Sequence, residues 1–147
     1  MLFHNNNRIL AIDPGEKRIG IAISDLSGTI ANPLIVIKHV SRKLDAKKIV
    51  GLIEKYDVKN VVMGISLDEQ GRATFSGRRA LRLGKLIMEK SNIPLEFWDE
   101  EGTTRKAVAA RISMGVSRKK RQGHLDEVAA AIILQGALAQ SLWFFLL

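Results

Sequence analysis

The sequence predicts an α/β fold with a five-stranded mixed sheet, in which the first three strands are antiparallel and helices flank the sheet. Two observations lead to this prediction. Three short apolar runs follow one another within the first 40 residues, with only short connections between them, as in an antiparallel meander. Further along the chain, helical periodicity alternates with short apolar runs, as in parallel strands joined by crossover helices.

The first three strands are read from apolar runs and the turn residues between them. Ile9 to Ile12 is continuously apolar, which is typical of a strand buried on both faces. Pro14-Gly15 is a turn signal, and a second apolar run covers Ile19 to Ile23. A third strand is expected within 30–40. Because Pro33 interrupts it, this strand either lies at a sheet edge or begins only after the proline.

The later elements are read from the spacing of apolar residues and from capping residues. Asn92 is expected to stop one helix, and Thr103 is a suitable N-cap for the next. In chain order we expect a helix over 44–56, a strand over 60–64, a polar loop over 67–77, a helix over 78–90, a strand over 94–98, a helix over 103–114, a basic loop over 117–124 and a buried helix from Asp126.

Length and composition predict one domain over residues 1–147 in a cytoplasmic protein. A chain of 147 residues that is 46% hydrophobic and 26% charged is ordinary for a globular domain. It has no cysteine, which excludes disulfides, thiolate catalysis and zinc sites built on cysteine, and fits a reducing compartment. The start, MLFHNNNR, lacks the pattern of a signal peptide.

The C-terminal segment 128–147 is uncharged and long enough to be weighed as a membrane anchor. Its glutamines and small alanines favour the alternative, a central helix buried against the sheet, so a membrane location is not expected. The ending WFFLL is interpreted as core packing or a self-association patch.

The charge balance predicts a polyanionic partner. The chain carries 23 lysines and arginines against 15 acidic residues, a formal net charge of +8. Nucleic acid is the first candidate and an anionic membrane surface the second, and the alternative is a basic protein without such a partner.

Three carboxylates stand at the ends of predicted elements. Asp13 follows the first strand, Glu100 follows the fifth and Asp126 opens the last helix. If strands one and five run the same way, Asp13 and Glu100 meet at one sheet edge, and the last helix could bring Asp126 there. Converging carboxylates favour Mg²⁺ or Mn²⁺, and two such ions can activate a water and stabilise the leaving oxygen of a phosphodiester.

Each carboxylate also has a purely structural interpretation. Asp13 could cap the Pro-Gly turn, Asp126 could be a helix N-cap, and Glu100 could face solvent. The site therefore depends on all three meeting. Other acidic residues compete for the same roles: Glu16, Asp25, Glu101 and Glu127.

Basic residues lie next to two of these carboxylates. Lys17 and Arg18 are in the turn after Asp13. The run before Asp126 is expected either to clamp phosphates or to be a solvated charged surface, and comprises Arg118, Lys119, Lys120 and Arg121. No aromatic residue interleaves this run, so backbone contact is expected there and not base stacking. His124 is either a proton shuttle or an idle loop residue.

Four blocks resemble the YqgF/RuvX family in order and spacing, over about residues 8–138: AIDPGEKRIGIAISD, VVMGISLDEQGR, FWDEEGTTRKA and SRKKRQGHLDEVAAAIILQ. The family is similar in fold to ribonuclease H and the RuvC-type resolvases. Its members are described as pre-16S rRNA nucleases and, earlier, as Holliday junction resolvases. The resemblance implies a metal-dependent nuclease whose acidic ligands fall on Asp13, Glu100 and Asp126.

Some residues depart from the family pattern. Glu101 and Gly102 replace the usual Arg and Leu after Glu100, and Ser66 stands at the third position of the Gly-Leu-Pro-Leu stretch. A negative charge at Glu101 bears on phosphate approach and metal binding. These departures affect the expected activity and substrate binding more than the expected fold.

We therefore expect an endonuclease acting on structured RNA, in 5′-end processing of pre-16S rRNA, with no small-molecule cofactor. One alternative is a resolvase of branched DNA, which implies a homodimer. Another is a nucleic-acid-binding protein without turnover. A nucleotide-binding protein is a weaker alternative, because an actin-like ATPase needs a second similar domain and 147 residues leave no room for one.

Overall fold

The structure is a computed structural model that describes residues 7–27, 30–99, 130–132 and 135. Residues 130–132 and 135 are helical, as expected for the last helix. The helix expected over 103–114 and the basic loop over 117–124 lie outside the described residues. The named elements are β1 (Arg8–Pro14), β2 (Arg18–Ser24), β3 (Ala31–Lys38), α1 (Arg42–Lys55), β4 (Val58–Ile65), α2 (Phe75–Ser91) and β5 (Leu95–Asp99).

The five strands form one mixed sheet in the order β3-β2-β1-β4-β5. β2 pairs antiparallel with both β1 and β3, whereas β4 pairs parallel with both β1 and β5. This confirms the predicted fold class and its antiparallel first three strands. Pro33 lies inside β3 and pairs with Ala22 next to a register shift, which an edge strand tolerates because its outer side needs no ladder donor.

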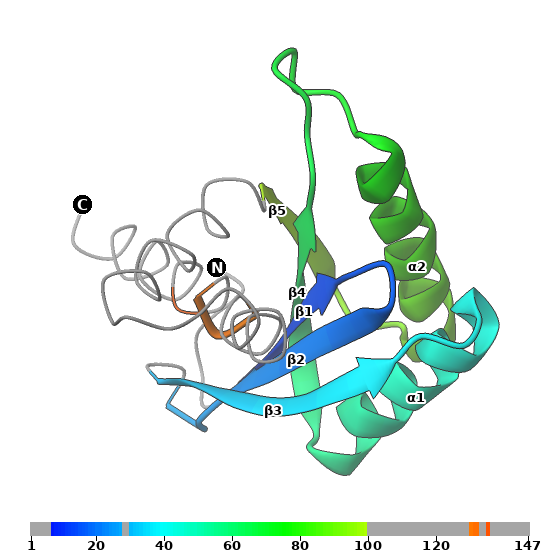
Figure 1. Cartoon of the computed structure of the whole chain (residues 1–147). Coiled ribbons are helices and arrows are strands. Elements are labelled where there is room, and N and C mark those ends of the chain that lie inside the picture. The colour runs from blue at the N-terminus through cyan, green and yellow to red at the C-terminus, as the bar shows by residue number, and fades with distance from the viewer. Residues whose placement is uncertain (1–6, 28–29, 100–129, 133–134, 136–147) are drawn as a thin grey trace, which may run out of the picture.

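Helices α1 and α2 cover one face of the sheet, as Figure 1 shows. We call this the helix face. Its core is made of large side chains: Leu10 and Ile12 from β1 and Met63 from β4 are fully buried with Ile49 of α1 and Ile87 of α2. Fully burying each such side chain stabilises the fold by about 1.5–3 kcal/mol. The helix face therefore supplies much of the stability of the domain.

The opposite face of the sheet packs mostly small side chains. Ile9 and Ala11 of β1 form a second buried cluster with Ala22, Val62 and Ala130. Figure 1 shows residues 130–132 on the side of the sheet away from α1 and α2. Because alanine has little bulk, a helix can approach the strands closely here, and this agrees with the prediction of a buried last helix.

Gln135 of the last helix contacts the edge strand β3. The backbone N–H of Ala31, the first residue of β3, donates to Oε1 of Gln135 at 3.3 Å. Most of the uncharged segment 128–147 lies outside the described residues, so the interpretation of WFFLL stays a prediction. No helix among the residues that are described is long and apolar enough to span a membrane.

The largest difference between a predicted and an observed helix boundary is at the start of α2. α2 begins at Phe75 and not at Arg78, with Thr74 as its N-cap accepting from the N–H of Gly77 at 3.1 Å. Gly77 was assigned to the loop because glycine is typical of turns, but here it is buried in the first helical turn. A Cβ at this position would lie 2.2 Å from the carbonyl oxygen of Ser66. The predicted stop at Asn92 is confirmed by its left-handed φ of 57°.

Candidate active site

Asp13 is a buried carboxylate near the carboxyl end of β1. Its exposed fraction is 6%, and its backbone pairs with Gly20 of β2. Side chains alternate along a strand, so Asp13 is on the same face as Ile9 and Ala11, opposite the helix face. Burying a carboxylate is unfavourable unless its charge is compensated. Such a position is therefore more typical of a functional group than of a packing residue.

The turn after Asp13 is held in one conformation by hydrogen bonds. The N–H of Gly15 donates to the carbonyl of Arg18 at 2.8 Å, and the N–H of His39 donates to the carbonyl of Lys17 at 2.9 Å. A Cβ on Gly15 would lie 2.4 Å from the oxygen of Arg18, so only glycine fits. Lys17, in this turn, and Arg18, the first residue of β2, are exposed. The fixed turn therefore brings the backbone of two basic residues close to Asp13 in the chain.

The carboxyl ends of β1, β4 and β5 lie at the same edge of the sheet. Ile12 pairs with Met63, and Met63 pairs with Phe97, all in parallel register. This confirms the condition on which the predicted site depends, that strands one and five run the same way. The last described residue of β5 is Asp99, which pairs with Ile65.

The other residues predicted for the site lie outside the described part of the chain. They are Glu100, Asp126, Arg118, Lys119, Lys120 and Arg121, together with His124 and the departures Glu101 and Gly102. Their roles stay predictions. Within residues 7–27, 30–99, 130–132 and 135, no group of three His, Cys, Asp or Glu side chains could hold a metal ion. Asp13 contributes one hard oxygen ligand of the kind that Mg²⁺ and Mn²⁺ prefer.

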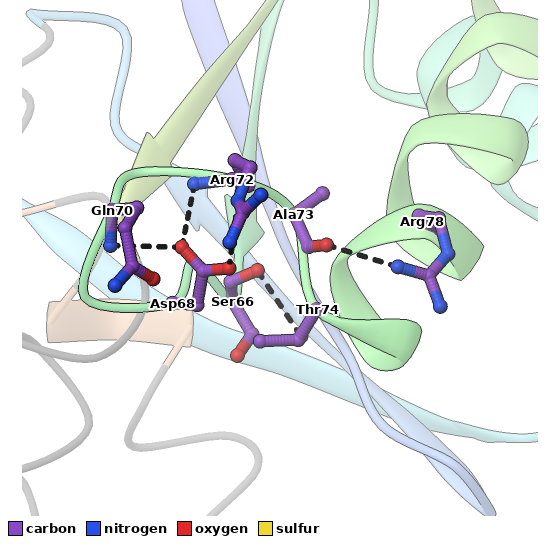
Figure 2. Close-up of polar contacts among 7 residues, drawn as sticks. All are labelled: Ser66, Asp68, Gln70, Arg72, Ala73, Thr74 and Arg78. Atoms are coloured by element: carbon purple, nitrogen blue, oxygen red, sulfur yellow. Dashed lines mark hydrogen bonds and ion pairs between the residues drawn. The ribbon is translucent and has the colours of Figure 1, made fainter.

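The loop between β4 and α2 leaves the sheet at the same edge as Asp13 and is internally ordered (Figure 2). Oδ1 of Asp68 accepts from the backbone N–H groups of Gln70 and Arg72, both at 2.9 Å. Oδ2 of Asp68 accepts from Nε of Arg72 at 3.3 Å. The carbonyl of Ser66 accepts from both the N–H and the hydroxyl of Thr74, which closes the loop.

This ordered loop presents cations that the sequence analysis did not single out. Arg72 is exposed, and Nη1 of Arg78 donates to the carbonyl of Ala73 at 3.1 Å (Figure 2). The Arg78 guanidinium also lies 5.9 Å from the ring centre of Phe75, which is 68% exposed. The sequence did contain a signal for these cations, because basic residues directly follow a polar loop that comes after a buried strand.

Comparisons with known proteins agree with this geometry. A family model described as "RuvX: Holliday junction resolvase" matches residues 7–140. A protein of Clostridium botulinum (strain Alaska E43 / Type E3), named "Putative pre-16S rRNA nuclease", is 39% identical over 131 residues, covering 89% of this chain and 96% of the relative.

Solved structures show the same fold at low sequence identity. RuvC of T. thermophilus in complex with a Holliday junction substrate superposes with a TM-score of 0.61 at 15% identity, covering 93% of this chain and 96% of that chain. The fowlpox virus Holliday junction resolvase gives 0.54 at 19% identity, with 91% and 99% covered. These likenesses confirm the expected ribonuclease H-like fold. The family match over residues 7–140 and the 39% identity to the clostridial relative show that the chain belongs to the RuvX family.

Proposed function

We propose that this protein is a metal-dependent endonuclease that hydrolyses phosphodiester bonds in structured nucleic acid, with Asp13, Glu100 and Asp126 as its acidic residues. The observation that carries the proposal is the buried Asp13 at the edge shared by the carboxyl ends of three parallel strands. Curated relatives named for pre-16S rRNA cleavage make 5′-end processing of that RNA the first candidate reaction, which implies the cytoplasm.

The alternation of β5 supports Glu100 as the second carboxylate. Trp98 packs against the same cluster as Ala11, whereas Phe97 packs on the helix face. Residues two apart in an extended strand share a face. If β5 continues by one residue, Glu100 falls on the face that carries Asp13.

The direction of the last helix supports Asp126 as the third. Gln135 contacts the beginning of β3, which lies at the sheet edge opposite Asp13. Ala130 packs nearer the middle of the sheet, so continuing the helix back towards its N-terminus leads to the edge of Asp13. If the helix continues back by one turn, Asp126 falls about 6 Å nearer to that edge than Ala130.

Three carboxylates at one edge suit two Mg²⁺ or Mn²⁺ ions, held by Asp13, Glu100 and Asp126. When bound, such ions supply an activated water and stabilise the leaving oxygen. The chain itself positions the phosphate backbone. Lys17 and Arg18, which follow Asp13 at the β1–β2 turn, are one phosphate contact in this proposal, and the run Arg118, Lys119, Lys120 and Arg121 is a second. Arg72 of the ordered loop and Arg78 of the first turn of α2 are further candidates for phosphate contact.

The test is a cleavage assay on labelled pre-16S rRNA and on a DNA four-way junction, with Mg²⁺, Mn²⁺ or chelator. We expect metal-dependent cutting that falls at least about a thousandfold in Asp13→Asn, because one carboxylate ligand is removed. Asp25→Asn is the matched control. Asp25 follows β2 at the opposite sheet edge, and its substitution should change the rate less than about twofold.

The choice of substrate separates the two candidate polymers. The family description and the resolvase neighbours favour branched DNA as the second candidate, and symmetric cutting of a junction would require two copies of the chain. Equal cutting by wild type and Asp13→Asn would refute the proposed site. Salt-sensitive binding without any product would instead support a nucleic-acid-binding protein without turnover.

A further inference from the structure

A cleft of about 200 Å³ opens on the helix face, behind the turn that follows Asp13. Its inner wall is apolar and includes Pro14, Ile19 and Leu83. Its polar lining comes from the β3–α1 connection, from α1 and from the first two turns of α2, and comprises His39, Ser41, Arg42, Asp45, Ser76 and Arg79. We propose that this cleft binds a phosphate monoester group, at a site separate from the nuclease centre.

The charge of the cleft favours an anion. Asp45 is its single lining carboxylate among the described residues, and its side chain is 2% exposed. Both of its oxygens are engaged locally, because Oδ1 accepts from the N–H of Val40 at 3.1 Å and Oδ2 is paired with Nδ1 of His39. In the described part of the chain, no carboxylate lies within ion-pair distance of the guanidinium of Arg42 or Arg79. Two uncompensated cations therefore face the same space.

The donors approach from more than one element, which suits the three terminal oxygens of a phosphate monoester. Arg42 comes from α1 and Arg79 from α2, and guanidinium groups bind phosphate with two parallel hydrogen bonds. Nη2 of Arg79 lies 3.5 Å from the carbonyl of Glu16, which holds this side chain against the turn. Ser76 adds a hydroxyl and, in the first turn of α2, a backbone N–H without an intrahelical partner.

The size of the cleft limits the ligand. A water molecule takes about 30 Å³, so a cleft of about 200 Å³ has room for a group larger than a single water molecule. Sites for drug-sized ligands span about 300–1,000 Å³, so a whole dinucleotide does not fit. The cleft therefore has room for inorganic phosphate or for the terminal phosphate of a nucleotide or nucleic acid strand.

The sheet separates this cleft from Asp13. Pro14 and Ile19 are paired across β1 and β2, and Ile19 belongs to the core of the helix face. Asp13 is on the opposite face. This phosphate site is therefore separate from the proposed nuclease site. A failure to bind phosphate would not affect the nuclease proposal, and a lack of nuclease activity would not affect the phosphate proposal.

The test is a titration of the ¹⁵N-labelled full chain with inorganic phosphate at constant ionic strength, followed by the NMR shifts of backbone amides and arginine Nε–H groups. We expect saturable shifts at Gly15, Ser76 and Arg79. The double variant Arg42→Gln/Arg79→Gln should weaken binding at least about tenfold, because both guanidinium groups are lost.

Two further variants distinguish a built site from general attraction. Lys48→Gln/Arg82→Gln removes the same charge from the same two helices at exposed positions that do not line the cleft, and should change affinity less than about twofold. Ser76→Leu fills the cleft without changing its charge, and should also abolish saturable binding. Equal effects of the two double variants, or shifts that rise linearly without saturation, would overturn the proposal.

The source of the phosphate is resolved with a 5′-phosphorylated dinucleotide and its 5′-hydroxyl form. Tighter binding of the phosphorylated form than of inorganic phosphate would support a terminal phosphate as the ligand. Equal binding of inorganic phosphate and the phosphorylated form would support the free ion. Equal binding of the two dinucleotides would overturn the proposal, because the monoester would then contribute nothing.

Discussion

Among the described residues two aspartates are buried, one on each side of the sheet, and they differ in what surrounds them. On the helix face, Asp45 is in the first turn of α1, and its carboxylate is held by His39 and Val40, which precede the helix. Its burial is explained by this local junction. On the opposite face, Asp13 stands at the edge where three parallel strands end, above a cluster of small side chains. The helix face supplies most of the large buried side chains, and we propose that the opposite face carries the chemistry.

The largest expected effect on stability is on the helix face. Ile49 of α1 is fully buried, so Ile49→Ala should lower the free energy of unfolding by about 2–5 kcal/mol through lost burial and a residual cavity. Urea unfolding followed by circular dichroism measures this. Leu44→Ala is the control on the same helix. Leu44 is 46% exposed, so a loss of less than about 0.5 kcal/mol is expected, and equal losses would contradict the assigned core.

A smaller effect is expected from enlarging a residue on the opposite face. Ala11 is fully buried in the cluster that includes Ala130. Ala11→Leu should lower the free energy of unfolding by about 1–3 kcal/mol, because the added carbons have no space against the last helix. The same urea experiment measures it. A variant as stable as wild type would show that this face is loosely packed.

Effects of opposite sign, the smaller of them at Gly51, are expected at two glycines, one in each helix of the helix face. Gly77→Ala should cost about 2 kcal/mol, because its Cβ would meet the Ser66 carbonyl that also accepts from Thr74. At Gly51 a Cβ meets nothing within 4 Å, so Gly51→Ala should raise stability by about 0.5–1 kcal/mol. Thermal unfolding of both variants checks the signs, and destabilisation by Gly51→Ala would contradict the open position.

The sequence predicted the sheet well because its signals are local. Continuous apolar runs identified β1 and β2. Pro33 left open an edge strand or a strand that begins after the proline, and β3 is an edge strand that begins earlier, at Ala31. The start of α2 was missed because glycine is typical of turns. The reason for glycine at position 77 is the carbonyl of Ser66, which is distant in sequence but adjacent in space. A local pattern cannot report such a contact between a loop and a helix.

The site was predictable only in part. Asp13 could be found because it directly ends a buried run, and the structure confirms that β1 and β5 are parallel. Glu100 and Asp126 lie outside the described residues, so their meeting with Asp13 stays a prediction. The order of the β4–α2 loop and the cleft between α1 and α2 depend on side chains from separate elements, and no spacing in the sequence indicated them.

The difference between the two aspartates is tested most directly by Mn²⁺ binding, followed by the electron paramagnetic resonance signal of the free ion. Asp13→Asn should weaken binding at least about tenfold while the free energy of unfolding changes by less than about 1 kcal/mol. Asp45→Asn should bind Mn²⁺ as wild type does but lose about 1–3 kcal/mol of stability, because its contacts with His39 and Val40 are weakened. Unchanged Mn²⁺ affinity in Asp13→Asn would contradict the assignment of the chemistry to that face.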